Sequence, residues 1–122
     1  MKSRDDSEKL YRRITSIEDA GVRRSAMRRL ARSDLYFLLV WVLGRRDARN
    51  SWCFDRCREV QGDPDGRLDL WARDHYKSTI ISVALSIQEI LKDPNVTIGV
   101  FSFNAGAAQD IVAQIKREFE SR

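Results

Sequence analysis

A loop at residues 62–66 divides this chain into two parts with different residue patterns. Its sequence, GDPDG, combines glycine, proline and aspartate, which are residue types typical of turns. Before the loop, apolar residues recur at helical spacing, whereas after it β-branched and aromatic runs alternate with helical segments. We therefore predict a basic helical segment at residues 1–61 and the first half of an α/β core at residues 62–122.

The segment before the loop contains three predicted helices. Ser16 is a possible capping hydroxyl with an acid three residues later, Ser33 and Asp34 are expected to cap the next helix, and Gly44 is typical of the residue that ends that helix. The longest apolar run, Leu35 to Leu43, has 9 residues, whereas a membrane span needs about 20, so we interpret this run as a buried helix. The predicted helices cover residues 17–31, 35–43 and about 51–60.

Basic residues are concentrated ahead of the loop. Residues 1–49 hold 13 lysines and arginines against 7 aspartates and glutamates, a net charge of +6, while the whole chain carries +4. Two interpretations are open: a solvated helix face, or a surface that binds a polyanion. The arginines of the predicted helix that lie opposite its apolar residues are Arg23, Arg24, Arg28, Arg29 and Arg32.

The two cysteines, Cys53 and Cys57, are four residues apart and would share one face of a helix. The chain has a single histidine, His75, so it lacks the four ligands of a structural zinc site. We expect two reduced, partly buried thiols, with a metal or redox role as the alternative.

Four elements are predicted after the loop. Residues 67–72 are expected to form a short strand, residues 78–91 a helix that is apolar around most of its surface, and residues 96–103 a buried strand. Asn104 is expected to cap a final amphipathic helix. The order strand, loop, helix, strand, helix predicts an α/β fold with a parallel sheet, and two strands make that sheet incomplete.

The segment WARDHYKSTI, residues 71–80, places Lys77, Ser78 and Thr79 between a predicted strand and a predicted helix. A phosphate-binding loop uses such a lysine for the outer phosphates and the following hydroxyl for Mg²⁺. Trp71 and Tyr76 stand where the motif has glycine. The residues alone leave two interpretations open, a phosphate loop or a capped helix with an exposed lysine.

Residues 67–82, RLDLWARDHYKSTIIS, resemble the variant Walker A segment of the large terminase subunits of tailed bacteriophages. The following VTIGVFSFNAGAAQDIVAQIKREFE resembles the next strand and helix of that family, so the resemblance covers about residues 60–120. It implies a P-loop NTPase fold, with ATP and Mg²⁺ as cofactors, in the N-terminal part of a DNA-packaging ATPase.

The resemblance also implies roles for individual residues. Lys77 would bind the β- and γ-phosphates, Ser78 would ligate Mg²⁺, and Arg73 would lie near the γ-phosphate, which makes Arg73 and Lys77 the implied catalytic residues. Tyr76 replaces a glycine, and a tyrosine with positive φ would be strained, so either the loop avoids that angle or nucleotide binding is weakened. The implied nucleotide-binding loop comprises Ala72, Arg73, Asp74, His75, Tyr76, Lys77, Ser78 and Thr79.

The family's partners are double-stranded phage DNA, the terminase small subunit, the portal of the procapsid and further copies of the large subunit. The implied location is the cytoplasm of the infected bacterial host, without membrane contact. No apolar run followed by Asp-Glu occurs in this chain and no nuclease domain is present, so we expect it not to hydrolyse ATP alone. The alternatives are another P-loop ATPase or kinase, or a non-enzymatic basic helical module that binds nucleic acid or a partner.

Overall fold

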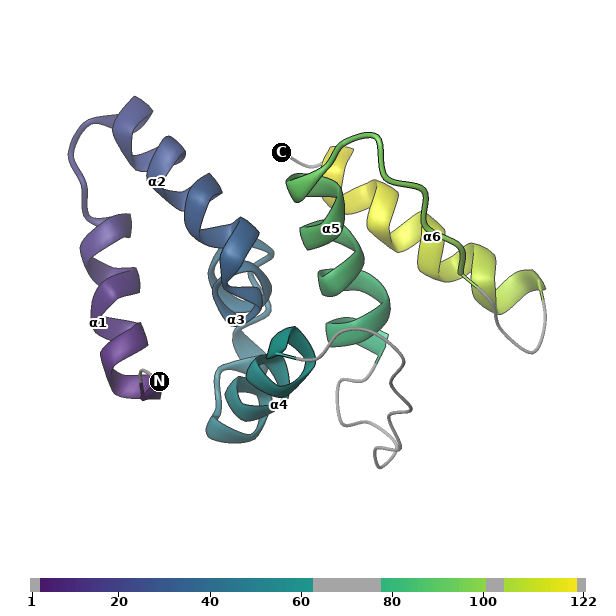
Figure 1. The fold of residues 1–122 in the computed structure, drawn as a ribbon, viewed down its shortest axis with the longest axis horizontal. Coiled ribbons are helices and arrows are strands. Elements are labelled where there is room, and N and C mark those ends of the chain that lie inside the picture. The colour runs from purple at the N-terminus through teal and green to yellow at the C-terminus, as the bar shows by residue number, and fades with distance from the viewer. Residues whose placement is uncertain (1–2, 63–77, 101–104, 121–122) are drawn as a thin grey trace. The chain divides into compact units, whose positions relative to one another are not determined.

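The computed structural model describes residues 3–62, 78–100 and 105–120. The chain forms two compact units, Met1–Arg67 and Leu68–Arg122, and each is described by itself. In the first unit the helices are α1 (Arg4–Thr15), α2 (Ala20–Ser33), α3 (Leu35–Phe37), the π-helical η1 (Leu38–Val42), the 3₁₀-helical η2 (Arg46–Ala48) and α4 (Ser51–Gly62) (Figure 1). In the second unit they are the π-helical η3 (Ser78–Leu85), α5 (Ser86–Lys92) and α6 (Ala105–Glu120).

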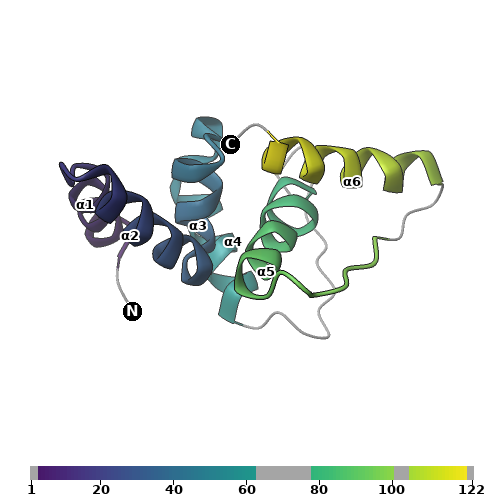
Figure 2. The ribbon, with the colours of Figure 1, turned by 90° about the horizontal axis from the view of Figure 1, so that it is seen from above.

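The predicted α/β fold with a parallel sheet is wrong, because the residues that the structure describes form helices and no strand. Residues 96–100, the described part of the second predicted strand, form an irregular connection between α5 and α6, and Val96 and Ile98 are exposed (Figures 1 and 2). The first predicted strand, residues 67–72, lies outside the described residues. A β-branched run favours a strand only where a neighbouring strand pairs with its backbone, and within the described residues none does.

Side chains cap the helices of the first unit at the turns between them. The Asp19 carboxylate accepts a hydrogen bond from the backbone N–H of Val22 at 3.0 Å, so Asp19, and not Ser16, caps α2. The Asp34 carboxylate caps α3 through the N–H of Phe37 at 3.1 Å, as predicted. Gly44 follows η1 with φ of 76°, which confirms that a left-handed glycine ends this helix. Helix α1 was not predicted at all.

Aromatic side chains from α1, α3, η1 and α4 form the core of the first unit. Tyr11 and Tyr36 are fully buried, and the Tyr11 ring lies 5.0 Å from the ring of Phe37 and 5.9 Å from that of Trp41. Phe54 of α4 meets Tyr36 edge-on at 5.1 Å. Such packing of large rings supplies most of the apolar burial that holds the short helices together.

In the second unit, η3 continues without interruption into α5. The helix predicted at residues 78–91 is confirmed, with Ile80, Val83, Ala84 and Ile87 buried and its other large apolar residues partly buried. Helix α6 contacts η3. None of its described residues is buried, and Val112 and Phe119 are exposed.

Candidate functional site

The predicted phosphate loop falls largely outside the described residues. Ala72, Arg73, Asp74, His75, Tyr76 and Lys77 all belong to the segment that the structure does not describe, and of Ser78 and Thr79 only the backbone is described. Their contacts with nucleotide and Mg²⁺ therefore stay predictions. The structure does describe the backbone that follows Lys77, and this backbone is helical from Ser78.

The helix that starts at Ser78 runs to Lys92, first as η3 and then as α5. The first backbone N–H groups of any helix lack partners within the helix and carry a partial positive charge, which favours a bound anion. In η3 the hydrogen bonds span five residues, a wider turn that is found often at functional positions. This end of the helix is suited to binding phosphate if Lys77 adds its charge.

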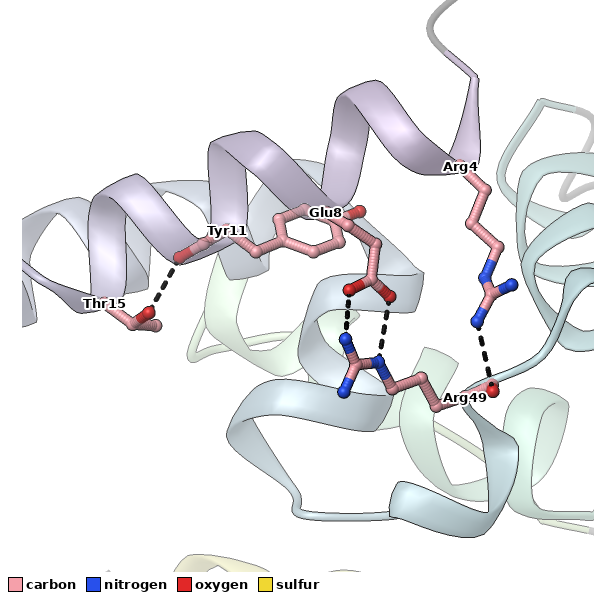
Figure 3. Close-up of polar contacts among 5 residues, drawn as sticks. All are labelled: Arg4, Glu8, Tyr11, Thr15 and Arg49. Carbon is pink, nitrogen blue, oxygen red and sulfur yellow. Dashed lines mark hydrogen bonds and ion pairs between the residues drawn. The ribbon is translucent and has the colours of Figure 1, made fainter.

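A second group of charged residues joins α1 to the turn before α4 (Figure 3). Arg49 donates two hydrogen bonds to the Glu8 carboxylate, from Nε to Oε1 at 3.1 Å and from Nη2 to Oε2 at 2.6 Å. Arg4 donates to the backbone carbonyl of Arg49 at 3.2 Å, and the Arg49 guanidinium lies 5.5 Å from the centre of the Trp41 ring. Hydrogen bonding to the Glu8 carboxylate raises the pKa of Arg49.

A shallow hollow of about 370 Å³ lies beside this ion pair. Its charges are four basic residues against two acidic ones, but Glu8 and Arg49 already neutralise each other. The geometry indicates a structural role in positioning α1 against the chain around Arg49. The lining residues are Arg4, Asp5, Glu8, Lys9, Arg12 and Arg49.

Sequence reasoning missed the pairing of Glu8 with Arg49. The two residues are 41 positions apart, and neither periodicity nor any local motif connects them. The Gln61 side chain is a similar case, because it accepts a hydrogen bond from the N–H of Leu35 at 2.6 Å and donates one to the carbonyl of Ser33. Both contacts satisfy backbone groups at the turn between α2 and α3.

The remaining reactive side chains of the first unit are buried. Cys53 and Cys57 are free thiols within α4, more deeply buried than predicted, and burial raises the pKa of both. Burial and the hydrogen bond that Tyr11 donates to Asp34 at 2.6 Å raise the pKa of the Tyr11 hydroxyl. Protonated, enclosed thiols and phenols are poor nucleophiles.

Neither a metal-binding cluster nor a membrane span is found in the parts of the chain that the structure describes. No three side chains among its histidines, cysteines, aspartates and glutamates are grouped to hold a metal ion. None of its helices has both the length and the apolar character needed to cross a bilayer. Comparisons of the chain with protein-family models, with curated proteins and with solved structures find no match.

Proposed function

We propose that residues 72–79 bind the phosphates of Mg-ATP, and that the chain acts as the N-terminal portion of a terminase large subunit of tailed bacteriophages. The observation that carries the proposal is that the described backbone is helical from Ser78, the residue immediately after Lys77, to Lys92. A phosphate loop needs its lysine at this position, since helix N–H groups and the ammonium group then converge on the same phosphates.

Four polar residues of the segment have a task in this proposal. Lys77 binds the β- and γ-phosphates as a point charge, while Ser78 ligates Mg²⁺ and Thr79 contacts the phosphates from the helix start. Arg73 stabilises negative charge near the γ-phosphate. Tyr76 takes the place of the usual glycine, and its side chain restricts how closely the backbone approaches the phosphates, so the affinity is modest.

The proposal extends to partners and location. As part of a packaging motor, the chain works with double-stranded DNA, the terminase small subunit, the portal of the procapsid and further copies of the large subunit, in the cytoplasm of the infected bacterium. The chain supplies nucleotide binding alone, because no Asp-Glu pair follows an apolar run to hold Mg²⁺ and activate water.

Equilibrium binding of a fluorescent ATP analogue with Mg²⁺ tests the proposal. Replacing Lys77 with alanine removes a charged hydrogen bond worth about 1.5–3 kcal/mol, which corresponds to a loss of affinity of about 10- to 150-fold. Lys92→Ala is the control, because Lys92 lies at the far end of the same helix and contacts Glu89 at 3.4 Å. Equal affinity of Lys77→Ala and wild-type protein, or no binding by the wild type, would refute the proposal.

A further inference from the structure

Helix α2 presents a continuous basic surface that nothing in the described parts of the chain neutralises. Its 14 residues include five arginines and no aspartate or glutamate. Arg23 is half-buried and donates to the carbonyl of Ile17 at 2.9 Å, whereas the other four are exposed. We call these four the α2 arginine face: Arg24, Arg28, Arg29 and Arg32.

The α2 arginine face is compact because of helix geometry. At about 100° per residue, its four arginines fall within an arc of about 140°. Arg24, Arg28 and Arg32 follow one another at intervals of four residues, which places them along a line of about 12 Å. The side of α2 opposite this arc carries Ala26, Met27 and Leu30, which are partly buried, so that side packs on the first unit and the arginines face outward.

Three other arginines of the first unit have carboxylate partners among the described residues, in contrast to the α2 arginine face. Arg45 pairs with Asp47, Arg49 with Glu8, and Arg56 with Glu59. Within the described residues, no carboxylate lies within ion-pair distance of the α2 arginine face. The acids at the two ends of α2, Asp19 and Asp34, accept hydrogen bonds from the backbone N–H groups that they cap.

This arrangement is unfavourable for the isolated helix. Arg24 and Arg28, and likewise Arg28 and Arg32, are like charges four residues apart, which destabilise a helix. A bound polyanion relieves this repulsion, because each guanidinium then has a phosphate partner.

We infer that the α2 arginine face binds the phosphate backbone of double-stranded nucleic acid, independently of any nucleotide site at Lys77. Along the roughly 12 Å of this face a duplex presents about seven phosphate charges, enough for every arginine. Arginine suits this contact because its guanidinium can bind a phosphate with two hydrogen bonds. Contacts of this kind give affinity without sequence preference.

Two other anionic partners fit the surface less well. Helix α2 has no aromatic residue on which unpaired bases would stack, as proteins that bind single strands usually have. A membrane-binding helix must bury a free apolar face, but the apolar side of α2 packs against α1, α3 and η1, which leaves Val22 as its exposed large apolar residue. The surface is therefore best matched to a duplex.

The test is fluorescence anisotropy of the full chain with a short labelled DNA duplex at several salt concentrations. The triple variant R24Q/R28Q/R32Q should bind at least about tenfold more weakly at low salt, and the slope of log K against log salt should fall by about 2.7, since each lost phosphate contact contributes about 0.9. Glutamine keeps the helix propensity of arginine close to unchanged. R24K/R28K/R32K retains the charge and should keep most of the slope.

The matched control is K92Q/K116Q/R117Q, which removes the same charge from exposed positions of the second unit. It should bind the duplex like the wild type. An equal loss in this control, or an unchanged slope in R24Q/R28Q/R32Q, would overturn the inference. So would tighter binding to a single strand, or binding to phosphatidylserine vesicles without binding to the duplex. Lys77→Ala should leave duplex binding unchanged, which separates this result from the nucleotide proposal.

Discussion

Replacing Glu8 with glutamine tests whether the ion pair with Arg49 holds α1 in place. The Glu8 side chain is only 9% exposed, whereas that of Arg49 is 41% exposed. Removing one partner of a fully buried pair costs about 3–5 kcal/mol. An exposed pair is worth about 0.2–1 kcal/mol. Because water still reaches Arg49, we expect a loss of unfolding free energy of about 1.5–2.5 kcal/mol.

Urea denaturation followed by circular dichroism measures this loss. The double-mutant cycle of Glu8→Gln, Arg49→Gln and both together isolates the pairwise energy, which we expect at about 1–2 kcal/mol, since the two side chains share two hydrogen bonds. The denaturant slope should stay the same, because the surface exposed on unfolding does not change.

The exposed pair of Lys92 with Glu89 is the control for this experiment. Both of its side chains are more than two-fifths exposed, so Glu89→Gln should cost no more than about 0.5 kcal/mol. If the Glu8–Arg49 coupling is as small as that of the control pair, burial does not strengthen this ion pair and the reasoning fails.

Two further predictions concern the first unit. Gly44→Ala should lower the unfolding free energy by about 1–2 kcal/mol, because Gly44 has φ of 76°. No atom lies near the position of the added Cβ, so the loss comes from the backbone and not from a clash. Gly44→Asn should therefore lower the unfolding free energy less, and equal losses for the two variants would contradict a backbone cause. Burial raises the pKa of the Cys57 thiol above its unfolded value of about 8.5. The contribution of this thiol to the unfolding free energy is therefore fully present below that pH and decreases above it, by about 1.4 kcal/mol per pH unit. Denaturation midpoints between pH 7.5 and 9.5 should therefore fall less in Cys57→Ala than in the wild type.

Local signals in the sequence were sufficient for most helices of the first unit. The cap at Asp34 and the glycine at position 44 depend on groups within three or four residues, and both were predicted. Ser16 was wrongly chosen over Asp19 as the cap of α2, since both precede the same apolar pattern. Helix α1 escaped notice because two of its three buried residues, Ser7 and Glu8, are polar, so its buried face gives no apolar pattern at helical spacing.

The strand prediction for residues 96–103 shows where local reasoning fails. Val96 and Ile98 belong to residue types that favour strands, but a strand needs a hydrogen-bonded neighbour, and composition does not reveal whether one exists. Residues 78–92 were read correctly as a helix, because its hydrogen bonds lie within the segment. The phosphate-loop prediction stays a prediction, since its side chains lie outside the described residues.

The sequence by itself determined the helical segments, their caps at Asp34 and Gly44, and the clustering of arginines on one side of α2, because these follow from interactions within a few residues. Tertiary structure alone decided that Glu8 pairs with Arg49, that Gln61 satisfies the backbone near Leu35, and that the α2 arginine face lacks carboxylate partners within the described residues. Those outcomes depend on which segments, distant in the sequence, come into contact when the aromatic core packs. Patterns within a few residues do not predict such contacts.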